Sequence, residues 1–104
     1  MRLVKAKAFK AGRAWGSDLL EVFEGRTSVK LHWTDAPFVW HANDGPEVLA
    51  VMDGVIDMHV RREGREEVIR MEAGDLMHFE DGDEHVVHPV GEARLLVVEH
   101  VDSL

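Results

Sequence analysis

The sequence contains no cysteine among its 104 residues. Disulfide bonds, thiolate metal sites and a cysteine nucleophile are therefore excluded, and the lack of cysteine fits a reducing compartment. No apolar run is long enough to span a bilayer. Residues 1–7 also lack the apolar stretch and the cleavage site of a signal peptide. We therefore expect a cytoplasmic protein that has no membrane partner.

Positive charge is scarce as well. The chain has 12 lysine and arginine residues against 20 aspartate and glutamate residues, so its formal net charge is −8. An acidic surface repels nucleic-acid phosphates and anionic lipids. The basic residues form no patch, since Arg61, Arg62 and Arg65 alternate with glutamates as in a solvated turn. The charge pattern argues against nucleic acid as a partner.

Helical periodicity is rare, whereas turn signals are regular. Clusters of Gly, Pro, Asn and Asp recur roughly every ten residues, which is the spacing of short strands in a sandwich or barrel. Between these clusters apolar and polar residues alternate, as Ile56 and Met58 do with Asp57. The length suits one domain over residues 1–104. We predict an all-β, single-domain fold.

Some segments are less regular than this alternation. Residues 16–23 contain a helix-capping serine but are soon ended by Gly25, and we favour a strand over a short helix there. Residues 47–52 and 95–99 are more uniformly apolar, which favours central strands.

Seven histidines are present, and most of them have an ordinary explanation. His32 and His59 fall on the polar parity of their segments and are expected to face solvent. His78 and His88 lie close in sequence to a candidate site, so each is expected either to enter a pocket or to be half-buried and hydrogen-bonded. His100, near the end of the chain, is expected to be structural or exposed.

Two polar clusters stand at predicted strand ends, in residues 40–47 and 74–85. In each cluster a His or Glu borders a glycine-containing turn. Such a residue can point into the mouth of a barrel while the strand itself fills the core. Phe38 and Trp40 share a parity and lead into His41, so we expect both rings to line an apolar-walled pocket.

These clusters resemble the paired motifs of the cupin superfamily. The residues that fall on the two motifs with matching spacing are His41, Asn43, Glu47, Gly54, Gly74, Gly82 and His85. The positions that depart from the usual residue are Asp35, Asn43, Glu80 and Pro89. The resemblance covers roughly residues 28–100 and is closest to small single-domain bacterial cupins. It implies a cupin-type β-barrel, also called a double-stranded β-helix or jelly roll.

The resemblance also implies a metal site. By position, one divalent transition metal (Fe, Mn, Ni or Zn) would be held by His41, Asn43, Glu47 and His85. Asn43 stands where the family usually has histidine, and its amide oxygen is the weaker ligand. The other three residues make a two-His-one-carboxylate set, which leaves open positions on the metal. Alternatively the metal is lost, Asn43 bonds its own turn, and Glu47 pairs with His85.

The function implied by the resemblance is that of a metal-dependent enzyme acting on a small organic molecule in the barrel mouth. The fold does not choose the reaction. The alternative, motivated by Asn43, is a non-catalytic cupin that binds a sugar or other metabolite without a metal. Members of the family commonly form homodimers in which N-terminal strands are added across the interface, and residues 2–9 could be such a strand. We therefore expect a small-molecule ligand and a homodimer.

Overall fold

The computed structural model describes residues 1–103, which are built almost entirely of antiparallel strands. The elements are η1, a short 3-10 turn (Ala6–Ala8), followed by β1 (Gly16–Phe23), β2 (Thr27–Thr34), β3 (His41–Ala42), β4 (Glu47–Arg62), β5 (Arg65–Glu72), β6 (Leu76–Phe79) and β7 (Glu84–His100). The predicted all-β class is confirmed, and residues 16–23 form a strand rather than a helix. No helix within residues 1–103 has the length and apolar character needed to cross a membrane.

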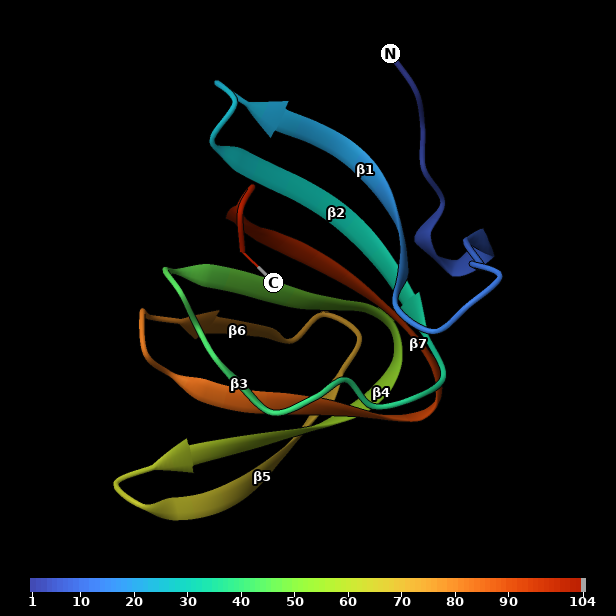
Figure 1. The fold of residues 1–104 in the computed structure, drawn as a ribbon. Coiled ribbons are helices and arrows are strands. Elements are labelled where there is room, and N and C mark those ends of the chain that lie inside the picture. Colours follow the sequence, from blue (N-terminus) through green and yellow to red (C-terminus); the bar gives the residue numbers. More distant parts are fainter. Residues whose placement is uncertain (104) are drawn as a thin grey trace.

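Two long strands join the two layers of the barrel. β4 and β7 pair from Glu47 opposite Glu99 to Arg61 opposite Glu84. Their register shifts around Asp53, where both strands bend, so each strand contributes to both layers (Figure 1). β1, β2 and β6 extend the first layer, and β3 and β5 extend the second. The strand starts that carry the motif residues lie at the end of the barrel opposite this bend.

Gly54 allows β4 to bend. Its φ is +85°, and a Cβ at this position would lie 3.0 Å from the Cα of Ala93 and collide with the carbonyl oxygen of Glu92. Glycine alone tolerates a positive φ together with such a close backbone approach. Gly54, one of the glycines that match the cupin motifs, is therefore required for β4 and β7 to pack together at their shared bend.

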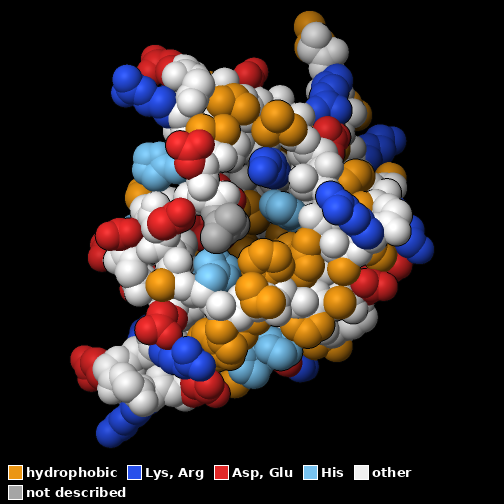
Figure 2. Space-filling model, in the orientation of Figure 1, with side chains coloured by type: hydrophobic (Ala, Val, Ile, Leu, Met, Phe, Trp, Pro, Cys, Tyr) orange, Lys and Arg blue, Asp and Glu red, His pale blue; other side chains and the backbone are white. Residues whose placement is uncertain are grey.

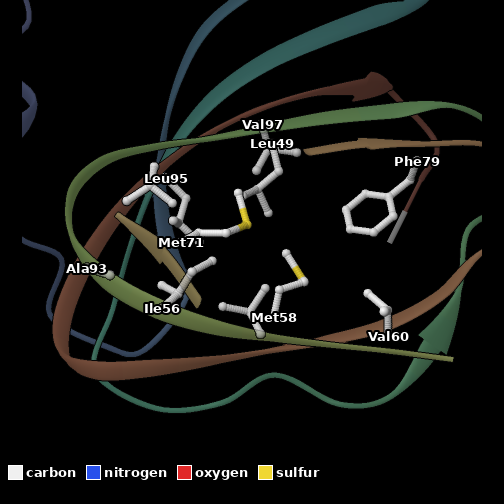
Figure 3. Close-up of a cluster of buried hydrophobic side chains, with 11 residues drawn as sticks. Leu49, Ile56, Met58, Val60, Met71, Phe79, Ala93, Leu95 and Val97 are labelled. Carbon is white, nitrogen blue, oxygen red and sulfur yellow. The ribbon is translucent and has the colours of Figure 1, made fainter. Parts of the chain in front are cut away.

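The hydrophobic core fills the space between the layers (Figure 3). Alternate residues of β4, such as Ile56 and Met58, point inward and are fully buried, as the predicted alternation requires. The buried cluster consists of Leu49, Val51, Ile56, Met58, Val60, Met71, Phe79, Val87, Ala93, Leu95 and Val97.

Residues 2–9 do not form the predicted N-terminal strand in the single chain. The segment contains η1 and is fixed to the outside of the first layer by side chains. Arg94 donates a hydrogen bond from Nε to the Phe9 carbonyl oxygen (2.9 Å). The Lys10 ammonium lies 5.5 Å from the ring centre of Trp33, which is only 4% exposed. The segment therefore covers part of the sheet face through side-chain contacts and leaves the strand edges unpaired.

Candidate metal centre

Three of the four predicted metal ligands meet at one point. His41, Glu47 and His85 each offer a ligand atom, and these atoms all lie within 4.8 Å of one another. The strand pairing explains this meeting. β3 pairs with β7 so that His41 stands directly opposite His85, and Glu47 is the first residue of β4.

The two histidine rings are held in place by their neighbours. Nδ1 of His41 donates to the carbonyl oxygen of Val39 (3.1 Å), which leaves the Nε2 lone pair of that ring free. The His85 ring stacks on Phe79, with 4.0 Å between ring centroids and 12° between ring planes. The centroids of His41 and His85 are 4.4 Å apart. Both imidazoles are therefore fixed beside the carboxyl group.

Burial controls the charges at this site. His85 is 2% exposed and Glu47 is 6% exposed. Burial and the nearby His41 lower the pKa of His85 to about 4. Burial also raises the pKa of Glu47, against the opposing hydrogen bond from Asn43. At neutral pH His85 is thus uncharged, so its 3.9 Å approach to Glu47 is not a salt bridge.

The donor set fits a divalent transition metal. A neutral imidazole with a free lone pair is the form that binds metal, and two imidazoles with one carboxylate suit Fe, Mn, Ni or Zn. Nε2 of His85 faces Glu47 but lies 3.9 Å from its Oε1, which is too far for a hydrogen bond, so this nitrogen is free to bind a metal. These observations favour a metal over a simple pairing of Glu47 with His85.

Asn43, the fourth predicted ligand, contacts the carboxylate of Glu47. Its Nδ2 donates a hydrogen bond to Oε1 of Glu47 (2.8 Å), and its Oδ1 is buried without a hydrogen-bond partner. Its backbone is fixed as well, since its N–H donates to Asp83 and its carbonyl accepts from Gly82. Because the amide nitrogen is drawn to the carboxylate, Asn43 orients a ligand in this structure.

A cavity of about 130 Å³ opens beside the three ligands. Figure 2 shows apolar side chains gathered around a recess with histidines at its rim. The lining residues are Trp15, His32, Phe38, His41, Glu47, Leu49, His85, Val87, Val97 and Glu99. Phe38 lies in the wall and meets the His41 ring edge-to-face.

Three residues predicted to enter the pocket lie elsewhere. The Trp40 ring lies beneath the Arg61 guanidinium, 4.0 Å from its centre, because residues 37–40 are not a strand and do not alternate. His78 is exposed, because its neighbours Met77 and Phe79 take the inward parity of β6. His88 points outward and meets His59, since His85 and Val87 hold the inward parity of β7.

Two residues of the cavity wall, His32 and Glu99, were not predicted from the sequence. His32, expected to face solvent, lines the cavity beside Trp15, and burial lowers its pKa. Glu99 stands opposite Glu47 in the sheet, and burial together with the charge of Glu47 raises its pKa to about 7. The orientation of Glu99 could have been predicted from the alternation along β7. Every second residue there points inward, so Glu99 lies on the same face as Val97 and Leu95, which are buried in the core.

Comparison with solved structures shows that this is the cupin fold. A cupin-2 domain protein from Shewanella frigidimarina NCIMB 400 is 24% identical, with a TM-score of 0.75 over 86% of this chain and 84% of that chain. A cupin superfamily protein from Desulfitobacterium hafniense DCB-2 is 14% identical, with a TM-score of 0.79 over 98% and 92%. Hydroquinone 1,2-dioxygenase PnpCD, in complex with Fe3+, is 21% identical, with a TM-score of 0.76 over 88% of this chain and 29% of that chain. No protein-family model and no curated protein matches the sequence. The predicted cupin-type barrel is confirmed.

Proposed function

We propose that this cupin-fold protein is a metal-dependent enzyme that acts on a small organic molecule in the barrel mouth. The observation that carries the proposal is the convergence of His41, Glu47 and His85 on one point beside an apolar-walled cavity. Bound Fe, Mn, Ni or Zn would supply Lewis-acid chemistry or activate water or dioxygen there. The similarity to an iron-containing dioxygenase supports a metal but does not select the ion or the reaction.

The residues of this chain have separable roles in the proposed site. His41 and His85 would supply neutral nitrogen donors, and Glu47 the carboxylate. Trp15 and Phe38, which meet edge-to-face with centroids 5.4 Å apart, form an aromatic wall that excludes water from one side. A cavity of about 150 Å³ holds one benzene molecule, so about 130 Å³ suits a compact group of roughly that size. A larger ligand would extend out of the mouth.

The decisive measurement is metal content. Untagged protein is reconstituted anaerobically with Fe2+, Mn2+, Ni2+ or Zn2+, washed briefly with a chelator to strip surface ions, and analysed by inductively coupled plasma mass spectrometry. We expect close to one retained equivalent of one of these ions. His85→Ala should lose it, because one of three ligands is gone. His78→Ala is the matched control, since His78 is exposed on β6 and should leave the content unchanged.

Two outcomes would contradict this proposal. Equal retained metal in wild-type protein and in His85→Ala would show that the ligand assignment is wrong. No retained metal with any of the four ions would favour the alternative, a non-catalytic cupin that binds a sugar or other metabolite. In that case a ligand-induced thermal shift should survive excess chelator.

We also propose that the protein is a cytoplasmic homodimer. Exposed apolar side chains on the outer face of the first layer support the dimer: Val48 and Met52 project from β4, and Leu76 projects from β6. Apolar side chains that are neighbours on a sheet face commonly mark an interaction surface. The absence of cysteine supports a reducing compartment.

A further inference from the structure

A pair of histidines lies on the outside of the second layer, away from the cavity. Met58 and Val60 of β4 are buried, so His59, between them, points outward. His88 of β7 also points outward, beside buried Val87. Asp57, two residues before His59 on the same face of β4, stands directly opposite His88 of β7. His59 and His88 are therefore diagonal neighbours on one face of the sheet.

The two rings are close and have free nitrogens. Their centroids are 4.1 Å apart, with 39° between the ring planes, and both residues are half-buried. Among residues 1–103, neither ring takes part in a hydrogen bond with another protein group. The hydrogen bonds of this patch run instead from Arg70 to both carboxylate oxygens of Asp57, at 2.9 and 3.0 Å. Asp57 is therefore already engaged, and the imidazoles are the available donors.

We propose that His59 and His88 form a second metal site, an exchangeable two-histidine site for Zn2+, Ni2+ or Cu2+. Zinc–nitrogen bonds of about 2.0–2.1 Å place two ligand nitrogens roughly 3 Å apart, and rings whose centroids are 4.1 Å apart can reach that separation by rotation about their side-chain bonds. Neutral imidazoles favour late first-row divalent ions, and water fills the remaining coordination positions. The net charge of −8 favours cation approach to the protein as a whole.

This second site differs in kind from the candidate metal centre. It has no carboxylate ligand, because Arg70 holds Asp57, and its donors are partly open to solvent. It therefore binds more weakly and exchanges readily, so a chelator wash empties it while leaving a buried three-ligand site filled. The two sites share no residue, so variants of one leave the other intact.

The test is a Zn2+ titration of the full chain in which the candidate metal centre has been disabled by His85→Ala. Isothermal titration calorimetry should show one equivalent of Zn2+ bound. His59→Gln or His88→Gln in this background should weaken binding about 100-fold, because the second nitrogen no longer benefits from a high effective concentration. His78→Gln, which removes an exposed histidine of β6 outside this pair, should leave the affinity unchanged. Imidazole NMR signals of His59 and His88 should shift together at the same Zn2+ concentration.

Three results would overturn the proposal. The first is unchanged Zn2+ affinity in both glutamine variants. The second is Zn2+-dependent NMR shifts confined to other histidines, and the third is no Zn2+ binding in the His85→Ala background, which would mean that the rings simply stack. If His85→Ala does not fold, His41→Ala replaces it, and folding is checked by circular dichroism. In wild-type protein the expected stoichiometry is two, falling to one in His59→Gln.

Discussion

Asn43 and Glu47 show what a single side chain contributes to the candidate metal centre. The motif makes Asn43 a ligand, whereas the structure has its amide donate to Glu47 at 2.8 Å. A residue that orients a ligand changes metal affinity, whereas a residue that is itself a ligand changes the coordination sphere. The two roles lead to different measurements.

We expect Asn43→Ala to weaken metal binding about 10–100-fold without abolishing it, as loss of an orienting group typically does. The backbone hydrogen bonds to Asp83 and Gly82 do not depend on the side chain and should persist. Competition against a chromophoric chelator measures the affinity. Complete loss of metal would instead make Asn43 a ligand, and unchanged affinity would give it no part in the site.

His32 carries the clearest pH prediction outside the metal ligands. Burial lowers its pKa, and the neighbouring Lys30 adds to this while the Trp15 backbone opposes it. The folded state therefore binds a proton less readily than the unfolded chain. The resulting stability is fully present above the ordinary histidine pKa of 6.5 and is lost as pH falls through the folded pKa.

In metal-free protein, His32→Phe should reduce the loss of unfolding free energy between about pH 7 and pH 5. One histidine contributes at most about 1.4 kcal/mol per pH unit. The pKa of His85 is also lowered, to about 4, so His85 also makes the unfolding free energy fall at acid pH. This part of the pH dependence should remain in the His32→Phe variant. Urea unfolding at several pH values measures the effect, with His78→Phe as the control. An identical pH slope in His32→Phe and wild-type protein would contradict the prediction.

Among the elements, the bend of β4 makes a comparison of two glycines informative. Gly54 has φ +85° and is crowded by the backbone of Glu92 and Ala93. Gly64, in the β4–β5 turn, has φ +76°, and a Cβ added there would meet nothing within 4 Å. A side chain is unfavourable at both positions because φ is positive, but only at Gly54 would the added Cβ also collide with neighbouring backbone.

Gly64→Ala should therefore cost about 1–2 kcal/mol of unfolding free energy, the penalty for a left-handed backbone. Gly54→Ala should cost more, about 2–5 kcal/mol, because crowding adds to the same penalty. Chemical denaturation of both variants compares them directly. Equal losses would show that the bend relaxes and that close approach of β7 is not what requires glycine.

The strands differ in how far their faces could be predicted from sequence. In β4 the alternation identified the buried face correctly, since Ile56 and Met58 lie in the core. In β2 the same rule failed: His32 lines the cavity, while buried Trp33 faces outward against the N-terminal segment. The alternation shows that a strand has two different faces. It does not show that a segment distant in sequence, here the N-terminal segment, covers the outer face. The loop before β3 has no alternation, which is why Trp40 was misplaced.

The whole molecule brings residues from distant elements into one site. His41, Glu47 and His85 were identified from motif spacing, yet the cavity also needs His32 from β2 and Glu99 from β7. No local pattern joins these two residues, because antiparallel pairing through β7 brings them together. The motif spacing predicts the ligands, and the cavity walls follow only from the pairing of all the strands.

The oligomeric state is the prediction that belongs to the whole molecule. Val48, Met52 and Leu76 expose an apolar surface on the outer face of the first layer, and a second copy of the chain would cover it. Light scattering coupled to gel filtration should give twice the mass of one chain. Leu76→Lys should shift the protein to monomer, because it would bury an unpaired charge.

Val68→Lys is the matched control for that experiment. Val68 is equally an exposed apolar residue, but it lies on β5 in the second layer. The control should remain dimeric, since the charge would face solvent. A monomeric wild-type protein at working concentration would remove the dimer proposal, and the exposed side chains of β4 and β6 would then be ordinary surface residues. A dimer broken by Val68→Lys but not by Leu76→Lys would move the interface to the second layer, beside His59 and His88.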